Sequence, residues 1–274
     1  MMRRFGQIHT IPFAVLFGLG VVFFAGWSSV AQGSGKLADG MQAQRAYAEG
    51  VDRYKVKDYA GAIPQFARAL KLLSDFDDAE ALLAWSYYYT GNYPEATRHF
   101  RQTLIRQPEW EGLHSGLGWS RYQVGRYHLA LEAFRQALAL DSSYRDAAVG
   151  FVYSLFELGR YAEALPHLER LTQEGEANML KSAAPDLEQV RSRYAWVLLY
   201  LGDYSKARDQ FAKAIVSQPE WSGLYNGLGW SYLRLGDKVR AHTSFQRALQ
   251  LQPNLSDAKD GLAQVGRGVT IDKK

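Results

Sequence analysis

The 274-residue sequence contains no cysteine. This absence excludes disulfide bonds, thiolate nucleophiles, cysteine-ligated zinc and iron–sulfur clusters. It also excludes a lipidated N-terminal cysteine, so any membrane attachment has to come from a hydrophobic segment. Small exported proteins often depend on disulfides, but a repeat array with a long continuous core does not need them.

The chain also lacks a strong excess of either charge. Its 32 basic and 28 acidic residues leave a net charge of +4. Two of the basic residues, Arg3 and Arg4, stand in an N-terminal segment without acids, so the rest of the chain is nearly neutral. Nucleic-acid-binding proteins usually carry a basic surface, and this composition therefore argues against that class.

No grouping of residues typical of catalysis is present. No glycine-rich phosphate loop follows a strand, and no serine stands in a nucleophile elbow. The histidines show neither pairing at i, i+4 nor the spacing of metal ligands; they are His9, His99, His114, His128, His167 and His242. We therefore predict a protein that is not an enzyme and has no metal site or other cofactor.

Hydrophobic residues concentrate in one run near the N-terminus, at residues 11–27. Arginines precede this run, and the small residues Ser29 and Ala31 follow it, as in a secretory signal peptide. Residues 1–31 are predicted to be a cleaved signal peptide or, alternatively, an uncleaved signal anchor that spans ~30 Å of hydrocarbon. Because the arginines stay inside, we expect an exported protein, either periplasmic or anchored to the inner membrane facing the periplasm.

The remainder of the chain repeats the motif Gly-x-Tyr-x-x-Ala, or close variants of it. The closing alanines are separated by 34, 34, 34, 43 and 34 residues; they are Ala62, Ala96, Ala130, Ala164, Ala207 and Ala241. A large apolar residue stands four positions after each alanine: Phe66, Phe100, Phe134, Leu168, Phe211 and Phe245. Six copies in phase predict a repeat architecture, because a single stray match cannot reproduce a period.

This pattern resembles the tetratricopeptide repeat (TPR) family over roughly residues 43–255. The sixth copy matches most fully, with Leu228, Gly229, Tyr232, Ala241, Phe245 and Pro253 at the family's positions. The resemblance implies an all-α fold, a right-handed superhelical solenoid of helix-turn-helix repeats. The turn glycines are expected to have positive φ; they are Gly91, Gly125, Gly159, Gly202 and Gly236, and Lys57 replaces the glycine in the first copy.

The array is internally duplicated. Residues 107–120 and 218–231 are identical at 11 of 14 positions, which relates copies 1–3 to copies 4–6. Nine extra residues lie near residues 172–187, where we expect a lengthened helix or inter-module loop, or alternatively a hinge or partner-docking element. After residues 1–31 we predict a short linker at 32–42 and a first TPR module at 43–178, which holds repeats 1–4 and is followed by the insert. A second TPR module at 188–255 holds repeats 5 and 6. A capping helix at 256–266 and a flexible tail at 267–274 end the chain.

Aromatic residues recur at one phase of the predicted first helices. Tryptophan occupies this phase in copies 2, 3, 5 and 6, and residues three and four positions further on share its face. In the TPR proteins that this chain resembles, that face lines the concave groove where partners bind. Carried over by position, the candidate ligand-binding residues are Trp85, Tyr88, Tyr89, Trp119, Tyr122, Tyr153, Trp196, Tyr200, Trp230 and Arg234. Alternatively, the tryptophans mainly pack between neighbouring copies.

Such a groove suits two classes of ligand. We predict a non-catalytic protein–protein interaction scaffold of the cell envelope, which binds an extended peptide or partner helix, for example of an envelope complex component. The alternative is a polysaccharide-binding TPR protein that assists exopolysaccharide or envelope assembly, because sugar rings stack on aromatic faces. Polar residues that would serve a sugar ligand are Ser115, Gln123, Gln189, Ser192 and Asn226.

Overall fold

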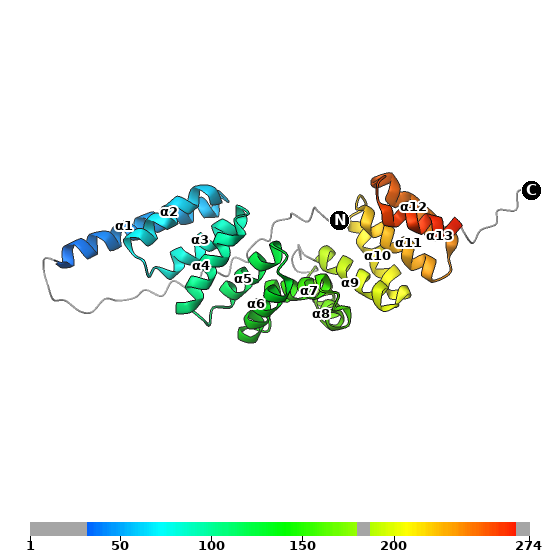
Figure 1. Ribbon diagram of the computed structural model, residues 1–274, viewed down its shortest axis with the longest axis horizontal. Helices are drawn as coiled ribbons and strands as arrows, with labels where there is room; N and C mark the ends of the chain where they lie inside the picture. Colours follow the sequence, from blue (N-terminus) through cyan, green and yellow to red (C-terminus); the bar gives the residue numbers. More distant parts are fainter. Residues whose placement is uncertain (1–31, 180–186, 267–274) are drawn as a thin grey trace, which may run out of the picture. The chain divides into compact units, whose positions relative to one another are not determined.

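The computed structural model describes residues 32–179 and 187–266. The predicted signal segment and the predicted tail lie outside these residues. Thirteen α-helices and no strand occur in the described ranges, which confirms the all-α prediction (Figure 1). Among these helices, none combines the length and the apolar character that crossing a membrane requires.

Each copy contributes a first and a second helix. The first helices are α1 (Gln32–Lys55), α3 (Asp77–Tyr89), α5 (Glu111–Gln123), α7 (Arg145–Glu157), α9 (Leu187–Leu201) and α11 (Ser222–Arg234). The second helices are α2 (Tyr59–Leu72), α4 (Tyr93–Arg106), α6 (Tyr127–Leu140), α8 (Tyr161–Met179), α10 (Tyr204–Ser217) and α12 (Lys238–Leu251). A last helix, α13 (Ser256–Gly266), follows the sixth copy and covers the residues predicted to form the capping helix.

The turn inside each copy depends on one residue in the left-handed conformation. The five turn glycines have φ between 69° and 88°, as expected. In the first copy Lys57 takes this conformation with a φ of 63°, which is costly for a residue with a Cβ. After the turn, Asp58, Asn92 and Asp203 cap the second helix, because each side chain accepts a hydrogen bond from the backbone N–H three residues on.

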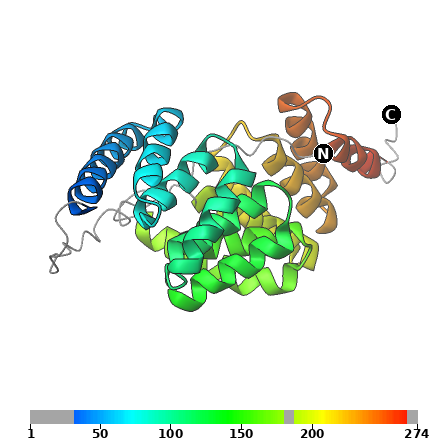
Figure 2. The same ribbon diagram turned by 60° about the vertical axis from the view of Figure 1, so that its left-hand side comes forward.

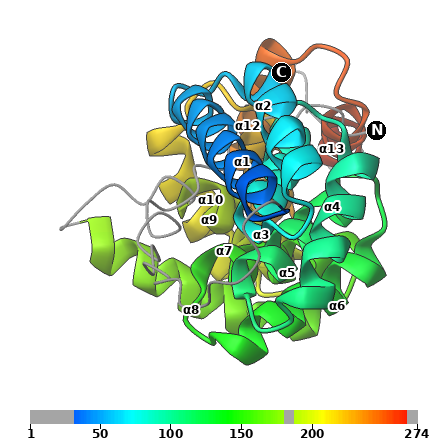
Figure 3. The same ribbon diagram turned by 90° about the vertical axis from the view of Figure 1, so that its left-hand side faces the viewer.

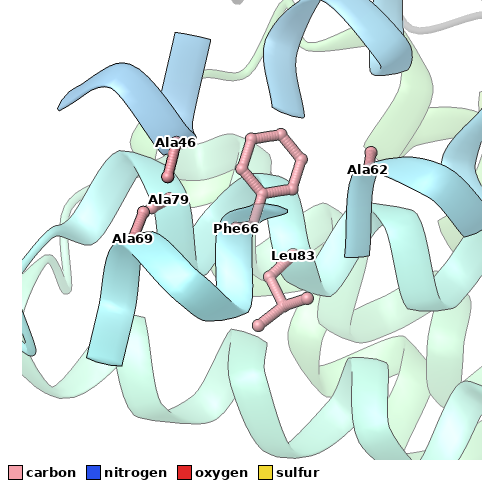
Figure 4. Packing of buried hydrophobic residues seen from close by; sticks show 6 residues of the cluster. All are labelled: Ala46, Ala62, Phe66, Ala69, Ala79 and Leu83. Atoms are coloured by element: carbon pink, nitrogen blue, oxygen red, sulfur yellow. The ribbon is translucent and has the colours of Figure 1, made fainter. Parts of the chain in front are cut away.

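Copies are joined by phenylalanine rings that pack against glycine. A Cβ added to Gly116 would lie 2.4 Å from the Phe100 ring, and one added to Gly227 would lie 2.2 Å from the Phe211 ring. Glycine thus lets the ring touch the backbone of the following first helix. In the first copy the equivalent ring is Phe66, which packs in a cluster with buried residues from α1, α2 and α3 (Figure 4); they are Ala46, Ala62, Ala69, Ala79 and Leu83.

The described residues form two compact units, and the division between them falls between Ser120 and Arg121. In the first unit α1 packs beside α2, and α3 packs on both α2 and α4 (Figure 3). In the second unit each helix from α6 to α13 packs on the next (Figure 2). The module boundary predicted between residues 178 and 188 lies inside the second unit.

The structure differs from the prediction at residues 32–42, which belong to α1 and do not form a linker. Glycines at three positions of this segment weaken a helix without ending it, and the segment contains no proline. Ala43 and Ala46 are buried, so the turns that follow are held in place and the helix extends from them.

The extra residues near 172–187 lengthen α8, which has 19 residues where α6 and α10 have 14. The added turn is fixed to the next two helices. Glu176 accepts hydrogen bonds from Arg191 of α9 at 3.0 Å and from Lys213 of α10 at 3.3 Å. The described part of the insert is therefore a lengthened helix; residues 180–186 lie outside the described ranges.

Candidate binding site

Aromatic rings from α1, α2 and α3 form a stack in the first unit, which we call ladder 1: Tyr54, Tyr59, Tyr89 and Trp85. Tyr59 stacks on Tyr89 with ring centroids 4.4 Å apart, and Tyr89 stacks on Trp85 at 5.9 Å. Trp85 meets Phe100 edge-on at 5.0 Å, which fixes the base of the ladder on the core. Ladder 1 is therefore a half-buried stack whose base is packed on the core.

The positions of these rings follow from the local sequence. Tyr59 is the first residue of α2 and comes directly after the capping residue Asp58, and its ring reaches Tyr89 of α3. Trp85 and Tyr89 are four residues apart on α3 and share one face of that helix. The turn of the first copy thus contacts the first helix of the second copy.

The second unit contains the same arrangement, ladder 2: Phe156, Tyr161, Tyr200 and Trp196. Tyr161 of α8 stacks on Tyr200 of α9 at 4.6 Å, and Tyr200 stacks on Trp196 at 5.8 Å. Trp196 meets Phe211 edge-on at 5.2 Å, as Trp85 meets Phe100. Phe156 takes the place of Tyr54.

A polar cluster lies beside ladder 2. The guanidinium carbon of Arg193 is 3.4 Å from the centroid of the Tyr153 ring, a close cation–π contact. The Tyr122 hydroxyl donates a hydrogen bond to Glu157 at 3.1 Å. Burial raises the pKa of Tyr122, although the nearby Arg193 opposes the shift, so this hydroxyl keeps its proton.

The ten residues predicted to bind a ligand differ widely in exposure. Tyr200 is 52% exposed, and Arg234 is also exposed. Four are half-buried: Tyr89, Tyr122, Trp196 and Trp230. The other four are buried: Trp85 at 7%, Tyr88 at 6%, Tyr153 at 3% and Trp119 at 1%. Trp119 and Tyr153 serve as packing residues in this structure, and ligand contact by the ten residues stays a prediction.

Trp230 is held by the helix that follows the last copy. Its indole Nε1 donates a hydrogen bond to Asp257 of α13 at 2.9 Å, and Asn226 donates to the same carboxylate oxygen at 2.6 Å. The indole also packs edge-on against Phe245. Two residues predicted to line the groove are thereby engaged by α13, and Trp230 belongs to neither ladder.

Sequence reasoning missed Tyr59, Tyr161 and Arg193. The two tyrosines belong to the repeated Gly-x-Tyr motif and were interpreted only as markers of the turn. Arg193 stands three residues before Trp196 and so shares its helix face, which is a signal that the sequence does contain. Its burial, at 8% exposure, could not be inferred from that spacing.

The described residues contain no group of three histidine or acidic side chains that could hold a metal ion. A buried pair, His99 Nδ1 and Glu80 Oε1 at 2.7 Å, links α4 to α3. Tyr87 stacks on the His99 ring and Arg98 contacts its Nε2, so both ring nitrogens and one ring face have partners. This pair has the surroundings of a structural contact between two helices.

Comparison with known proteins identifies the family. A family model described as tetratricopeptide repeat matches residues 47–109, 115–178 and 182–256. No curated protein matches the sequence.

Solved structures share the fold at low identity. YrrB, described as a TPR protein with an unusual peptide-binding site, is 18% identical with a TM-score of 0.61, covering 71% of this chain and 96% of its own. MamA of AMB-1 is 20% identical with a TM-score of 0.57, and the match covers 64% of this chain and 98% of MamA. A tetratricopeptide repeat protein from Parabacteroides merdae is 19% identical with a TM-score of 0.53, and the match covers 82% of this chain and 84% of that protein. With its paired helices, its glycine turns and three matched stretches that span most of its length, the chain belongs to the tetratricopeptide repeat family.

Proposed function

We propose that this protein is a non-catalytic interaction scaffold that binds a peptide segment of a partner protein on its aromatic ladders. The observation that carries the proposal is the exposure of Tyr200 in ladder 2, whose neighbours are fixed on the core. Such a ring offers contact area without losing conformational freedom on binding. The family supports a scaffold role, and YrrB, which shares the fold, is described as having a peptide-binding site.

The way in which the rings stack favours a peptide over a sugar. Sugar rings bind by lying on open aromatic faces, but Tyr89 and Tyr200 each stack on two other rings. Two stacking partners leave less of the faces of Tyr89 and Tyr200 open to a sugar ring. Polysaccharide binding, with a role in exopolysaccharide or envelope assembly, is therefore the less supported alternative.

The proposal places the scaffold in the cell envelope. Its support is the sequence of residues 1–31, in which a basic start, an apolar run and small residues follow one another as in an export signal. Fractionation of cells that produce the full chain tests this part. We expect the protein in the periplasmic extract or in the inner-membrane fraction, and recovery from the cytoplasm alone would contradict the envelope assignment.

The binding part is tested by selecting peptides from a displayed library on the intact protein and titrating them while tryptophan fluorescence is recorded. A ligand on ladder 2 should change the emission of Trp196, which stacks on Tyr200. Tyr200→Ala should weaken binding by about tenfold or more. Val216→Ala is the matched control, because Val216 is 83% exposed on α10 and belongs to no ladder. Binding of a polysaccharide panel without any peptide binding would favour the alternative.

A further inference from the structure

The two ladders agree closely in geometry. The tyrosine pairs stack at interplanar angles of 21° and 17°, and the tyrosine–tryptophan pairs at 25° and 28°. The edge-on contacts below them have angles of 80° and 81°. The insert lies between Tyr161 and Tyr200 in the chain, yet it lengthens α8 at the far end of that helix and leaves the stack unchanged.

A simple rule explains why ladders form at two of the junctions between copies. A ladder needs two tyrosines. One is the first residue of the second helix of a copy, and the other stands in the first helix of the following copy, four residues after the tryptophan position. Tyr59 with Tyr89 and Tyr161 with Tyr200 satisfy this rule. At the other junctions the second position is occupied by Gln123, Glu157 or Arg234. The same ring arrangement therefore occurs twice, once in each compact unit, and Tyr200 of ladder 2 is more exposed than Tyr89 of ladder 1.

The exposed parts of a ladder define the group that fits it. The edge of an aromatic ring is electropositive and its face is electronegative. Since Tyr89 and Tyr200 each stack on two rings, we expect a ligand to meet their electropositive edges, which are complementary to the π face of an aromatic side chain. Burial raises the pKa of the Tyr59, Tyr161 and Tyr200 hydroxyls, so these groups keep their protons and donate to peptide carbonyls.

Building on the proposed function, we propose that ladder 1 and ladder 2 are two equivalent sites for the same short peptide element, which contains an aromatic side chain. One protein molecule then binds two copies of this element. The partner is either two separate molecules or one chain that carries the element twice.

The experiment uses the full chain and a peptide selected on it from a displayed library, synthesised in its original form and with its aromatic residue replaced by leucine. Isothermal titration calorimetry should give two sites for the original peptide. The leucine form should bind at least tenfold more weakly. Tyr89→Gln and Tyr200→Gln should each leave one site, and the double variant should leave none.

Glutamine is chosen because copy 3 has Gln123 at this position, so the fold accepts it; circular dichroism checks that helicity is retained. Ile105→Ala and Val216→Ala are the matched controls, since both residues are more than 80% exposed on second helices. Three results would each overturn the inference. The unaltered chain could show one binding site, the double variant could keep both sites, or the leucine form of the peptide could bind as well as the original. If no peptide binds at all, the proposed function itself fails, which is a different result from a single site.

Discussion

Arg193 of α9 lies over the ring of Tyr153 of α7, with its guanidinium carbon 3.4 Å from the ring centroid. This contact exists because the junction between the fourth and fifth copies is built differently from the others. At three other junctions a phenylalanine packs against a glycine of the next first helix, as Phe100 does against Gly116. At this junction Leu168 stands in the place of the phenylalanine and Arg193 in the place of the glycine.

The exchange predicts that residues 168 and 193 are energetically coupled. Arg193→Gly alone should destabilise the protein by about 1–2 kcal/mol, because the cation–π contact is lost and the space beside Leu168 stays unfilled. Leu168→Phe alone should also destabilise, because the larger ring meets Arg193. The double variant restores the phenylalanine–glycine pair found at three other junctions, and it should be at least about 1 kcal/mol more stable than the sum of the single effects predicts. Urea unfolding of the four proteins measures this coupling, and simple additivity would contradict it.

The strained turn of the first copy predicts a stabilising substitution. Lys57 has a φ of 63°, a conformation that glycine adopts without steric cost. Lys57→Gly should therefore raise the free energy of unfolding by about 1 kcal/mol, chiefly for α1 and α2. Hydrogen exchange of the backbone amides in these helices reports the change.

Gly91→Ala is the matched control for this substitution. Gly91 has a φ of 81°, and no atom lies within 4 Å of a Cβ added there, so any effect is conformational. This variant should destabilise the second copy by about 1 kcal/mol. A destabilising Lys57→Gly, or a neutral Gly91→Ala, would show that turn strain does not set local stability in this array.

The capping aspartates predict a loss of stability in acid. Asp237 caps α12 as Asp58 caps α2, by accepting a hydrogen bond from the backbone N–H of Arg240. Backbone and arginine hydrogen bonds lower the pKa of Asp58 and Asp237 below the value of 3.8 that an unfolded chain has. The stabilisation that each ionised carboxylate contributes is therefore complete above the pKa of the aspartate in the unfolded chain. It is lost as the pH falls through the lower pKa that the aspartate has in the folded protein. The double variant Asp58→Asn, Asp237→Asn keeps an oxygen acceptor at each cap but cannot be protonated there. Between about pH 5 and about pH 3, its Tm should therefore fall less than the Tm of the unaltered chain. Parallel Tm curves for the two proteins would rule this effect out.

The fold was predictable because it is periodic. A motif that occurs six times, with four of its five spacings equal to 34 residues, identifies the helix pairs, and the turn glycines need no tertiary information to be located. Residues 32–42 are predicted as a linker but belong to α1, because the buried Ala43 and Ala46 hold the turns that follow. Helix extension depends on packing farther along the chain, which local composition does not report.

The candidate site was predictable only in part. Helix periodicity placed Trp85 and Tyr89 on one face, and they do form part of a ladder. The same periodicity gave Trp119 an equal rank, although its side chain is 1% exposed. Burial of a ring depends on the residues that neighbouring copies bring against it. The turn tyrosines Tyr59 and Tyr161 were missed because their stacking partners belong to the next copy.

The central claim is that the ladders are the surface to which a peptide binds. The most direct measurement is photo-crosslinking of the intact protein with a selected peptide in which benzoylphenylalanine replaces the aromatic residue, followed by mass spectrometry of the crosslinked fragments. The account predicts crosslinks at residues 54–59, 85–89, 156–161 and 196–200. Crosslinks that instead fall on the second helices around Ile105 and Val216, with none at the ladders, would contradict it.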